Sequence, residues 1–266
     1  MTRPVRVAVN GASGRMGAAL LDLLAGDARF ELAHAVVPAG SARAGMQVYP
    51  AGAGELRYAV GWAEAPAVDV VVDFSGPDGL CAALDHCLDQ GVALVSGTTG
   101  IDAALQQRLT EAGGRIAILQ SANFSLGVAV LTRLLREAAA ALPGWDLEIL
   151  EAHHGRKRDA PSGTALALGH AAALARGTTL EQAAVYRRED RSGDRVEGSI
   201  GFAVVRGGDI VGEHTAMLIG QGERLELIHR ATDRSIFARG ALHAAHWLHG
   251  RRASTWQLDD VLDGSP

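Results

Sequence analysis

The first half of the chain alternates short β-branched runs with stretches in which apolar residues recur at helical spacing. The runs predict strands at residues 5–9, 32–37, 68–74, 91–96 and 115–119. Helical spacing occupies residues 16–24, 80–89 and 102–111 between them. Because strands that alternate with helices are joined by crossovers, this half predicts an α/β fold with a parallel sheet and helices on both faces.

The pattern changes after residue 123. A long Ala/Leu-rich helix is predicted at 126–142, followed by an alternating strand at 145–151 and further strands at 198–205, 214–219 and 224–229. Strands without helices between them favour an open, mixed sheet in an α+β domain. Residues 234–249 are again helical, so we expect one domain of residues 1–124 with 235–266 and another of 125–234. The excursion at 177–193 is expected to be mobile.

Composition narrows the classes of protein. Hydrophobic residues make up 48% of the 266 residues, and the formal net charge is −5, which argues against nucleic-acid binding as a general property. Cys81 and Cys87 match neither a redox pair nor a zinc knuckle, so we expect free thiols. The chain enters a strand at once and has no long apolar run, which predicts a cytoplasmic protein without membrane contact.

A glycine-rich turn lies between the first strand and the first helix. It reads Gly11, Ala12, Ser13, Gly14, Arg15, Met16, Gly17. Backbone N–H groups and a helix start in this position can hold a pyrophosphate, which predicts a Rossmann-like, dinucleotide-binding domain that takes NADH or NADPH. A glycine turn that serves only helix packing is the alternative.

The end of the second strand carries no acid for an adenosine ribose. Val37 and Pro38 occupy the place where a dinucleotide fold usually has Asp or Glu, and Arg43 follows closely enough to meet a 2′-phosphate. We therefore expect use of both cofactors with a modest lean toward NADPH. Arg43 as an ordinary surface residue is the competing interpretation.

Two further loops follow strand ends and should lie at the carboxyl edge of the sheet, where open α/β sheets bind ligands. They are Gly97, Thr98, Thr99 after one strand and Ser121, Ala122, Asn123, Phe124 after the next. We expect these loops to face the nicotinamide and the substrate, although ordinary strand-exit turns would read similarly.

The densest chemical signal runs from a strand end into a helix, as EAHHGRKRDAPSGT at residues 151–164. Ser162 is a good N-cap, so Gly163 and Thr164 would begin a helix whose N–H groups can receive a carboxylate. Either His153 or His154 is suited to proton transfer near neutral pH, and Lys157 lies close to other cations that can lower its pKa enough for it to give up a proton. Adjacent His residues on a strand point to opposite faces and no third ligand is evident, so we expect no metal site. A solvated charge run and structural His residues remain as alternatives.

These motifs resemble those of the bacterial and plant 4-hydroxy-tetrahydrodipicolinate reductases over nearly the whole chain. The matching stretches are VAVNGASGRMG, VVDFSGPDG, GTTG, SANFSLGV, EILEAHHGRKRDAPSGTAL, IGFAVVRGGDIVGEHTAM and FARGAL. The resemblance implies that His153 is the general acid/base and Lys157 a proton donor. It implies that His154, Gly163 and Thr164 bind the carboxylates of a small cyclic dicarboxylate substrate. From their places at the helix start and in the strand-exit loop, we expect Ser162 and Thr99 to contact the substrate as well. It further implies reduction at ring C4 in lysine biosynthesis, by way of diaminopimelate, and a homotetramer formed through the second domain.

Two other functions compete with this interpretation. A semialdehyde dehydrogenase needs a catalytic Cys, whereas Cys81 and Cys87 fall inside a predicted helix. An NAD(P)-sensing regulator without catalysis would have no use for paired His and Lys residues beside Pro-Ser-Gly-Thr. It would bind NADH without oxidising it.

Overall fold

A computed structural model describes residues 3–49, 55–188 and 193–264. The chain divides into two compact units, residues 1–124 with 235–266 and residues 125–234. We call them unit 1 and unit 2 and describe each by itself.

Unit 1 is built on a parallel sheet of seven strands in the order β12-β6-β5-β4-β1-β2-β3. The strands are β1 (Val5–Asn10), β2 (Phe30–Val37), β3 (Tyr58–Val60), β4 (Val70–Asp73), β5 (Ala93–Ser96), β6 (Ala117–Gln120) and β12 (Ser254–Trp256). The central strands β1, β4 and β5 are almost entirely buried, which explains their continuous apolar sequences. Their carboxyl ends, and therefore the loops that follow them, meet at one edge.

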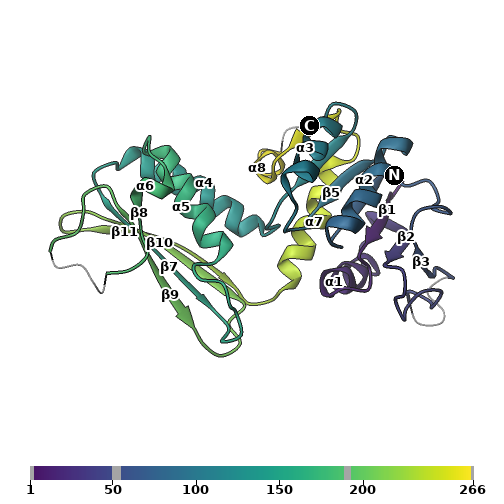
Figure 1. Ribbon diagram of the computed structural model, residues 1–266, viewed down its shortest axis with the longest axis horizontal. Helices are drawn as coiled ribbons and strands as arrows, with labels where there is room; N and C mark the ends of the chain where they lie inside the picture. Colours follow the sequence, from purple (N-terminus) through teal and green to yellow (C-terminus); the bar gives the residue numbers. More distant parts are fainter. Residues whose placement is uncertain (1–2, 50–54, 189–192, 265–266) are drawn as a thin grey trace. The chain divides into compact units, whose positions relative to one another are not determined.

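Helices cover both faces of this sheet (Figure 1). The helices of unit 1 are α1 (Arg15–Leu24), α2 (Pro77–Gln90), α3 (Ala103–Ala112), α7 (Ser235–Leu248) and α8 (Leu258–Leu262). Helices α1 and α7 pack together, and α2 packs with α3 against the other face. The expected Rossmann-like architecture is confirmed.

Unit 2 contains a mixed sheet of five strands in the order β11-β10-β7-β9-β8. The strands are β7 (Asp146–His153), β8 (Ala184–Val185), β9 (Ile200–Arg206), β10 (Gly212–Ile219) and β11 (Arg224–Ala231), and the helices are α4 (Leu126–Ala141), α5 (Gly163–Ala175) and α6 (Leu180–Ala183). Helices α4 and α5 pack on one face, where Leu147 and Ile149 of β7 join the core. This arrangement confirms the expected open, mixed sheet.

The sequence pattern missed the shortest elements, namely β3, β8, β12, α6 and α8. A strand of two or three residues has no measurable alternation, so only its partners define it. Part of the excursion expected to be mobile is ordered, since it forms α6 and β8, and residues 189–192 lie outside the described part. None of the helices in the described residues is long and apolar enough to span a membrane.

Candidate active site

The turn after β1 needs glycine at two of its positions. Gly11 has φ of +79°, and a Cβ there would lie 2.5 Å from the carbonyl oxygen of Phe74. A Cβ at Gly17 would lie 2.3 Å from the carbonyl oxygen of Gly11. The turn is therefore pressed between the loop after β4 and helix α1, a packing that only glycine permits.

The same turn presents the start of α1 to the carboxyl edge of the sheet. The Ala12 amide donates to the Val36 carbonyl at 2.9 Å, and this bond ties the turn to β2. Gly14 precedes the first helical residue, Arg15, and supplies no side-chain cap. The first amides of an uncapped helix are suited to an anion.

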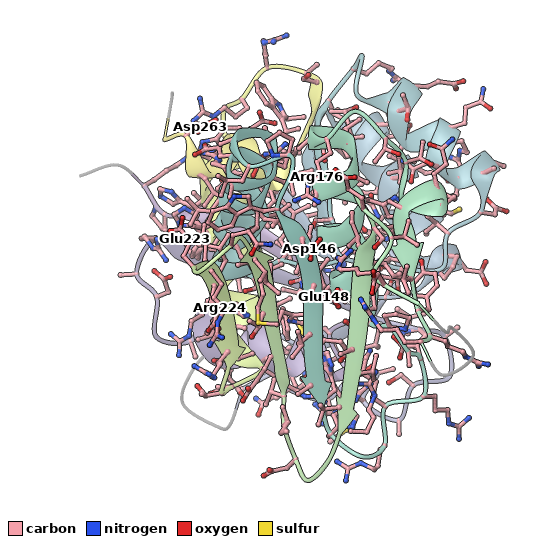
Figure 2. All side chains as sticks on the ribbon, turned by 90° about the vertical axis from the view of Figure 1, so that its left-hand side faces the viewer. Asp146, Glu148, Arg176, Glu223, Arg224 and Asp263 are labelled. Carbon is pink, nitrogen blue, oxygen red and sulfur yellow. The ribbon has the colours of Figure 1, made fainter. Side chains whose placement is uncertain are left out.

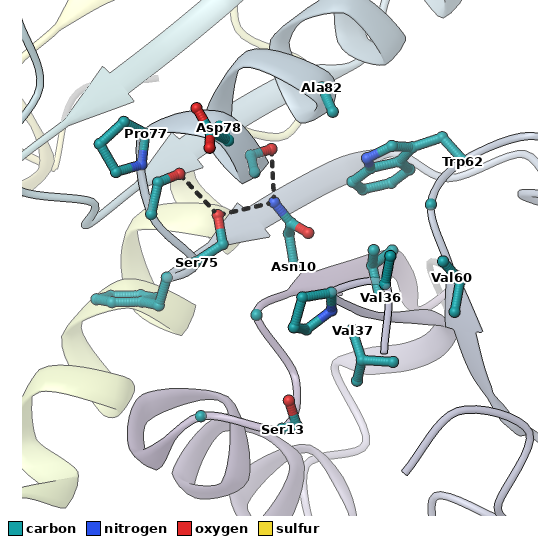
Figure 3. Close-up of a pocket in the computed structure, with 18 residues that line it drawn as sticks. Asn10, Ser13, Val36, Val37, Val60, Trp62, Ser75, Pro77, Asp78 and Ala82 are labelled. Atoms are coloured by element: carbon teal, nitrogen blue, oxygen red, sulfur yellow. Dashed lines mark hydrogen bonds between the residues drawn. The ribbon is translucent and has the colours of Figure 1, made fainter. Parts of the chain in front are cut away.

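A pocket of about 570 Å³ opens beside this turn. It is lined by Asn10, Gly11, Ser13, Gly14, Val36, Val37, Pro38, Ala39, Val60, Gly61, Trp62, Phe74, Ser75, Gly76, Pro77, Asp78, Gly79 and Ala82. Figure 3 shows Val36, Val37, Val60 and Trp62 gathered on one side, with Ser75 and Pro77 on the other. A largely apolar cavity with a few polar groups at its rim is typical of a site for an organic ligand.

A buried carboxylate connects the loops around this edge. Asp73, at the end of β4, is 0% exposed. Its Oδ1 accepts from Asn10 Nδ2 at 2.8 Å and from Ser75 Oγ at 2.5 Å. Its Oδ2 accepts from Ser96 Oγ at 2.8 Å and from Thr98 Oγ1 at 2.7 Å. One side chain thus joins the ends of β1, β4 and β5.

Phe74 adds an apolar contact to the same assembly. A Cβ at Gly97 would lie 2.1 Å from the Phe74 ring, so the two loops touch with no room for a side chain. The ring of Phe74 also packs edge-on against Phe124, with centroids 5.6 Å apart. The loops that contain Gly97 and Phe124 are therefore brought together, as their shared sheet edge predicted. Thr99 is exposed beside them.

The residues considered for the ribose do not all line the pocket. Val37 and Pro38 do, whereas the Arg43 guanidinium donates to the Tyr58 hydroxyl at 3.2 Å and is not part of the lining. Trp62 also lines the pocket, although no sequence motif predicted it, and its ring stacks on His86 with centroids 4.5 Å apart. The sequence signal for this contact was limited to a Trp that directly follows Val60 and Gly61.

In unit 2, the buried carboxylate of Glu151 forms hydrogen bonds with Arg206 and His153. Glu151 Oε2 accepts from His153 Nδ1 at 2.6 Å, and the two η nitrogens of Arg206 bond its two oxygens at 2.8 and 2.7 Å. The Ser162 amide donates to Oε1 at 3.0 Å. Burial acts to raise the pKa of Glu151, but the bonds from Arg206, His153 and Ser162 outweigh it and lower the pKa.

Ser162 links this cluster to α5 and to β10. Its hydroxyl oxygen accepts from the Ala165 amide at 3.2 Å, as an N-cap does, and lies 3.1 Å from His214 Nε2. Burial, followed by the nearby His153, lowers the pKa of His214 to about 4. His214 is therefore neutral at physiological pH, and α5 begins at Gly163 and Thr164 beside these groups.

The loop between β7 and α5 carries the remaining cations. Lys157 Nζ lies 2.7 Å from Asp159 Oδ2, and this contact lowers the pKa of that carboxyl. Burial, then Arg234 and Arg156, lower the pKa of His154, while its amide donates to Ile210 at 2.8 Å. His154 and Lys157 thus lie in the loop that leads from His153 at the end of β7 to the start of α5, and Lys157 is close enough to affect the pKa of His154.

Two alternatives from the sequence can be assessed here. Within the described residues, no group of three His, Cys, Asp or Glu side chains could hold a metal ion. Cys81 and Cys87 lie in α2, where burial raises the pKa of the Cys87 thiol. The buried Cys87 thiol is therefore a poor nucleophile, and Cys81 is partly buried against the core of unit 1, so neither resembles the catalytic thiol of a semialdehyde dehydrogenase.

Known proteins share both units of this chain. The family model described as "Dihydrodipicolinate reductase, N-terminus" matches residues 5–124, and "Dihydrodipicolinate reductase, C-terminus" matches residues 127–262. Relatives from Xanthomonas campestris pv. campestris (strain B100) and Xanthomonas euvesicatoria pv. vesicatoria (strain 85-10) are named 4-hydroxy-tetrahydrodipicolinate reductase. Each is 47% identical over 262 residues, which covers 98% of this chain and 99% of the relative.

Solved structures agree on the fold. "Dipicolinate bound Dihydrodipicolinate reductase from Paenisporosarcina sp. TG-14" superimposes with a TM-score of 0.80 at 23% identity, covering 97% of this chain and 99% of that one. A probable dehydrogenase from Thermotoga maritima gives a TM-score of 0.60 at 14% identity, with 98% and 90% coverage. Together, the two family matches and the close relatives place this chain in the dihydrodipicolinate reductase family.

Proposed function

We propose that the chain reduces 4-hydroxy-tetrahydrodipicolinate to tetrahydrodipicolinate with a hydride from NADH or NADPH, on the route to diaminopimelate and lysine. The observation that carries this proposal is the cluster of His153, Glu151 and Ser162 at the start of α5, in a chain 47% identical to reductases of that name. A titratable imidazole beside a helix start is suited to protonating an anionic dicarboxylate as it is reduced.

The cofactor is proposed to bind unit 1. Its pyrophosphate would lie on the turn formed by Gly11, Ala12, Ser13, Gly14, Arg15 and Met16. The tight packing at Gly11 and the uncapped start of α1 support this placement. The adenosine would occupy the 570 Å³ pocket, against Val37, Pro38 and Trp62. The bound nicotinamide supplies the hydride, and the loops at Gly97–Thr99 and Ser121–Phe124 would position its ring.

The substrate and the protons are assigned to unit 2. The start of α5, at Ser162, Gly163 and Thr164, would hold one carboxylate together with His154, and Thr99 of unit 1 is proposed as a further contact. Loss of water from the 4-hydroxy substrate gives a conjugated dihydropyridine. As the hydride arrives at C4 of that ring, negative charge develops toward the ring nitrogen. His153 and Lys157 would supply the proton and offset that charge.

Both cofactors are expected to serve, with a modest lean toward NADPH. No carboxylate at Val37 or Pro38 favours the ribose diol, and none there repels a 2′-phosphate. A carboxylate does line the pocket elsewhere, at Asp78 in the first turn of α2. Arg43 would have to leave Tyr58 to reach the phosphate, which keeps the preference small.

A homotetramer in the cytoplasm completes the proposal. The face of the unit 2 sheet that helices leave open carries a row formed by Ile228, Thr215, Leu150 and Ala203 on four neighbouring strands. Figure 2 looks onto this sheet, with Asp146 and Glu148 labelled on β7. An open sheet face in water is usually polar, so a second copy of the chain is the proposed cover. Sedimentation equilibrium would test the mass.

The decisive experiment follows NAD(P)H absorbance while the substrate is generated enzymatically in the cuvette. Oxidation that requires both the substrate and this protein is the expected result, with competitive inhibition by pyridine-2,6-dicarboxylate. A flat trace with folded protein that binds NADH would favour the regulator instead.

A further inference from the structure

One nitrogen of the His153 ring, Nδ1, makes a hydrogen bond within the protein. Glu151 and His153 are two residues apart on β7, so both side chains lie on the same face of the sheet. The contact between Glu151 Oε2 and His153 Nδ1 is 2.6 Å. An ionised carboxylate can only accept, so Nδ1 must carry the hydrogen. This leaves Nε2, which has no hydrogen-bond partner among the described residues, to act on a ligand.

Glu151 is itself held in place by hydrogen bonds, because each of its two carboxylate oxygens accepts two of them. Its side chain is 1% exposed, and its two oxygens receive Arg206, the Ser162 amide and His153. A buried carboxyl without such partners would take up a proton. Here the bidentate guanidinium keeps the charge on the carboxylate.

We infer that Glu151 is a positioning residue for the proposed reduction. It fixes the tautomer and orientation of His153, and Arg206 fixes Glu151. This inference rests on the proposed function, in which His153 is the proton donor. A buried ion pair that only ties β9 to β7 would leave the titration of His153 unaffected, so the two roles differ in a measurable way.

Several charged or titratable groups lie close to His153 or to its partner Glu151. They are Glu151 on β7, Arg206 on β9, His214 on β10, and His154, Lys157 and Asp159 in the following loop. Glu151 favours the imidazolium, whereas Arg206 opposes it while it shares the same carboxylate. Removing one or the other should therefore move the titration of His153 in opposite directions.

The test uses Glu151→Gln and Arg206→Gln in the full chain, with Glu148→Gln as the matched control. Glu148 is also on β7 and pairs with Arg195 at 3.1 Å, but it lies outside the cluster. The titration of His153 is followed by NMR, with its signal identified among the 10 His residues by comparison with His153→Gln. The pH profile of kcat/KM is measured alongside.

We expect the midpoint of His153 to fall by about 1–2 pH units in Glu151→Gln, to rise in Arg206→Gln and to stay unchanged in Glu148→Gln. Shifts in the same direction, or none in Glu151→Gln, would overturn the inference. If Glu151→Gln does not fold, the absence of a rise in Arg206→Gln overturns it. If the NMR midpoints move as expected but the kcat/KM profile does not follow, the role of His153 in the proposed function fails instead.

Discussion

Each unit buries one carboxylate at the end of a strand, and the two carboxylates are stabilised by different kinds of hydrogen-bond donor. Asp73 in unit 1 is 0% exposed and receives hydrogen bonds from Asn10 and from hydroxyl groups such as those of Ser96 and Thr98. Glu151 in unit 2 is 2% exposed and is paired with Arg206 and His153. Asp73 has neutral partners, whereas the partners of Glu151 include a guanidinium and a group that titrates.

The difference indicates what each cluster can do. Neutral donors around Asp73 keep the same charge throughout the physiological pH range, so this cluster fixes the shape of the loops at the sheet edge. The cluster around Glu151 changes its charge whenever His153 gains or loses a proton. In the proposed function, the Asp73 cluster would keep the ligand-binding loops of unit 1 in shape, and the Glu151 cluster would couple binding to proton transfer in unit 2.

Replacing the titrating member should produce the largest effect. We expect His153→Gln to lower kcat by roughly 10²–10⁴-fold with little change in KM, because positioned proton transfer contributes about that much to rate. His154→Gln serves as the neighbouring control and should raise KM more than it lowers kcat. Steady-state kinetics of both variants check the assignment, and an unchanged kcat in both would show that neither is the acid.

His214 provides a thermodynamic test of the same cluster. Its pKa is about 4 in the folded protein and about 6.5 in an unfolded chain. The unfolded state therefore binds more protons, and stability should be lost as pH falls from about 6.5 to 4, by on the order of 3 kcal/mol. His214→Asn should flatten the pH dependence of the unfolding free energy in this window.

Denaturant titrations at several pH values measure that slope. His243→Asn is a control on α7 in the other unit. An equally steep loss of stability in His214→Asn and in the unchanged protein would mean that His214 titrates normally.

The Asp73 cluster should behave differently when it is broken. Asp73→Asn keeps the size of the side chain but replaces an acceptor oxygen with a donor facing hydroxyl groups. We expect it to reduce stability by about 1–3 kcal/mol at all pH values near neutral, and to raise KM for NADH more than it changes kcat. Thermal unfolding and kinetics report the two effects.

Two variants of Thr98 test the bond between the loop and Asp73 without changing the carboxylate itself. Thr98→Val removes the hydroxyl that donates to Asp73 at 2.7 Å, and Thr98→Ser retains it. NADH affinity should fall in the first variant and recover in the second. Equal affinities would mean that the loop holds its shape without this bond.

The sequence predicted the longer helices and the buried strands, because a helix repeats its apolar residues at a fixed spacing and a buried strand is a continuous apolar run. The buried run of β4 and the helical spacing of α4 could be read directly. The approach of Arg206 to Glu151 could not, since the two residues are 55 positions apart and meet only through the pairing of β7 with β9. For the same reason, Asp73 was part of a recognised stretch but its partners on β1 and β5 were not foreseen. Local patterns predict elements, whereas registers between distant strands assemble a site.

The smallest expected effect concerns the preference between NADH and NADPH. Unit 1 has no carboxylate at Val37 or Pro38, where it could bind the ribose diol. Val37→Glu would add an acceptor for the ribose diol and repel a 2′-phosphate in the pocket that Val37 lines. At a separation of about 4 Å and with the dielectric constant of water, this repulsion is worth about 1 kcal/mol, or roughly fivefold in relative KM toward NADH.

Arg43 tests the opposite charge. Its guanidinium donates to the Tyr58 hydroxyl at 3.2 Å, so binding a 2′-phosphate requires Arg43 to exchange one partner for another. A charge-assisted bond worth about 1.5–3 kcal/mol is reduced by that exchange and by solvent screening. Arg43→Ala should therefore weaken NADPH by a few-fold and leave NADH unchanged, and Tyr58→Phe should free Arg43 and strengthen NADPH slightly. If the unaltered protein strongly prefers NADH and neither variant changes either KM, the segment after Pro38 does not contact the ribose.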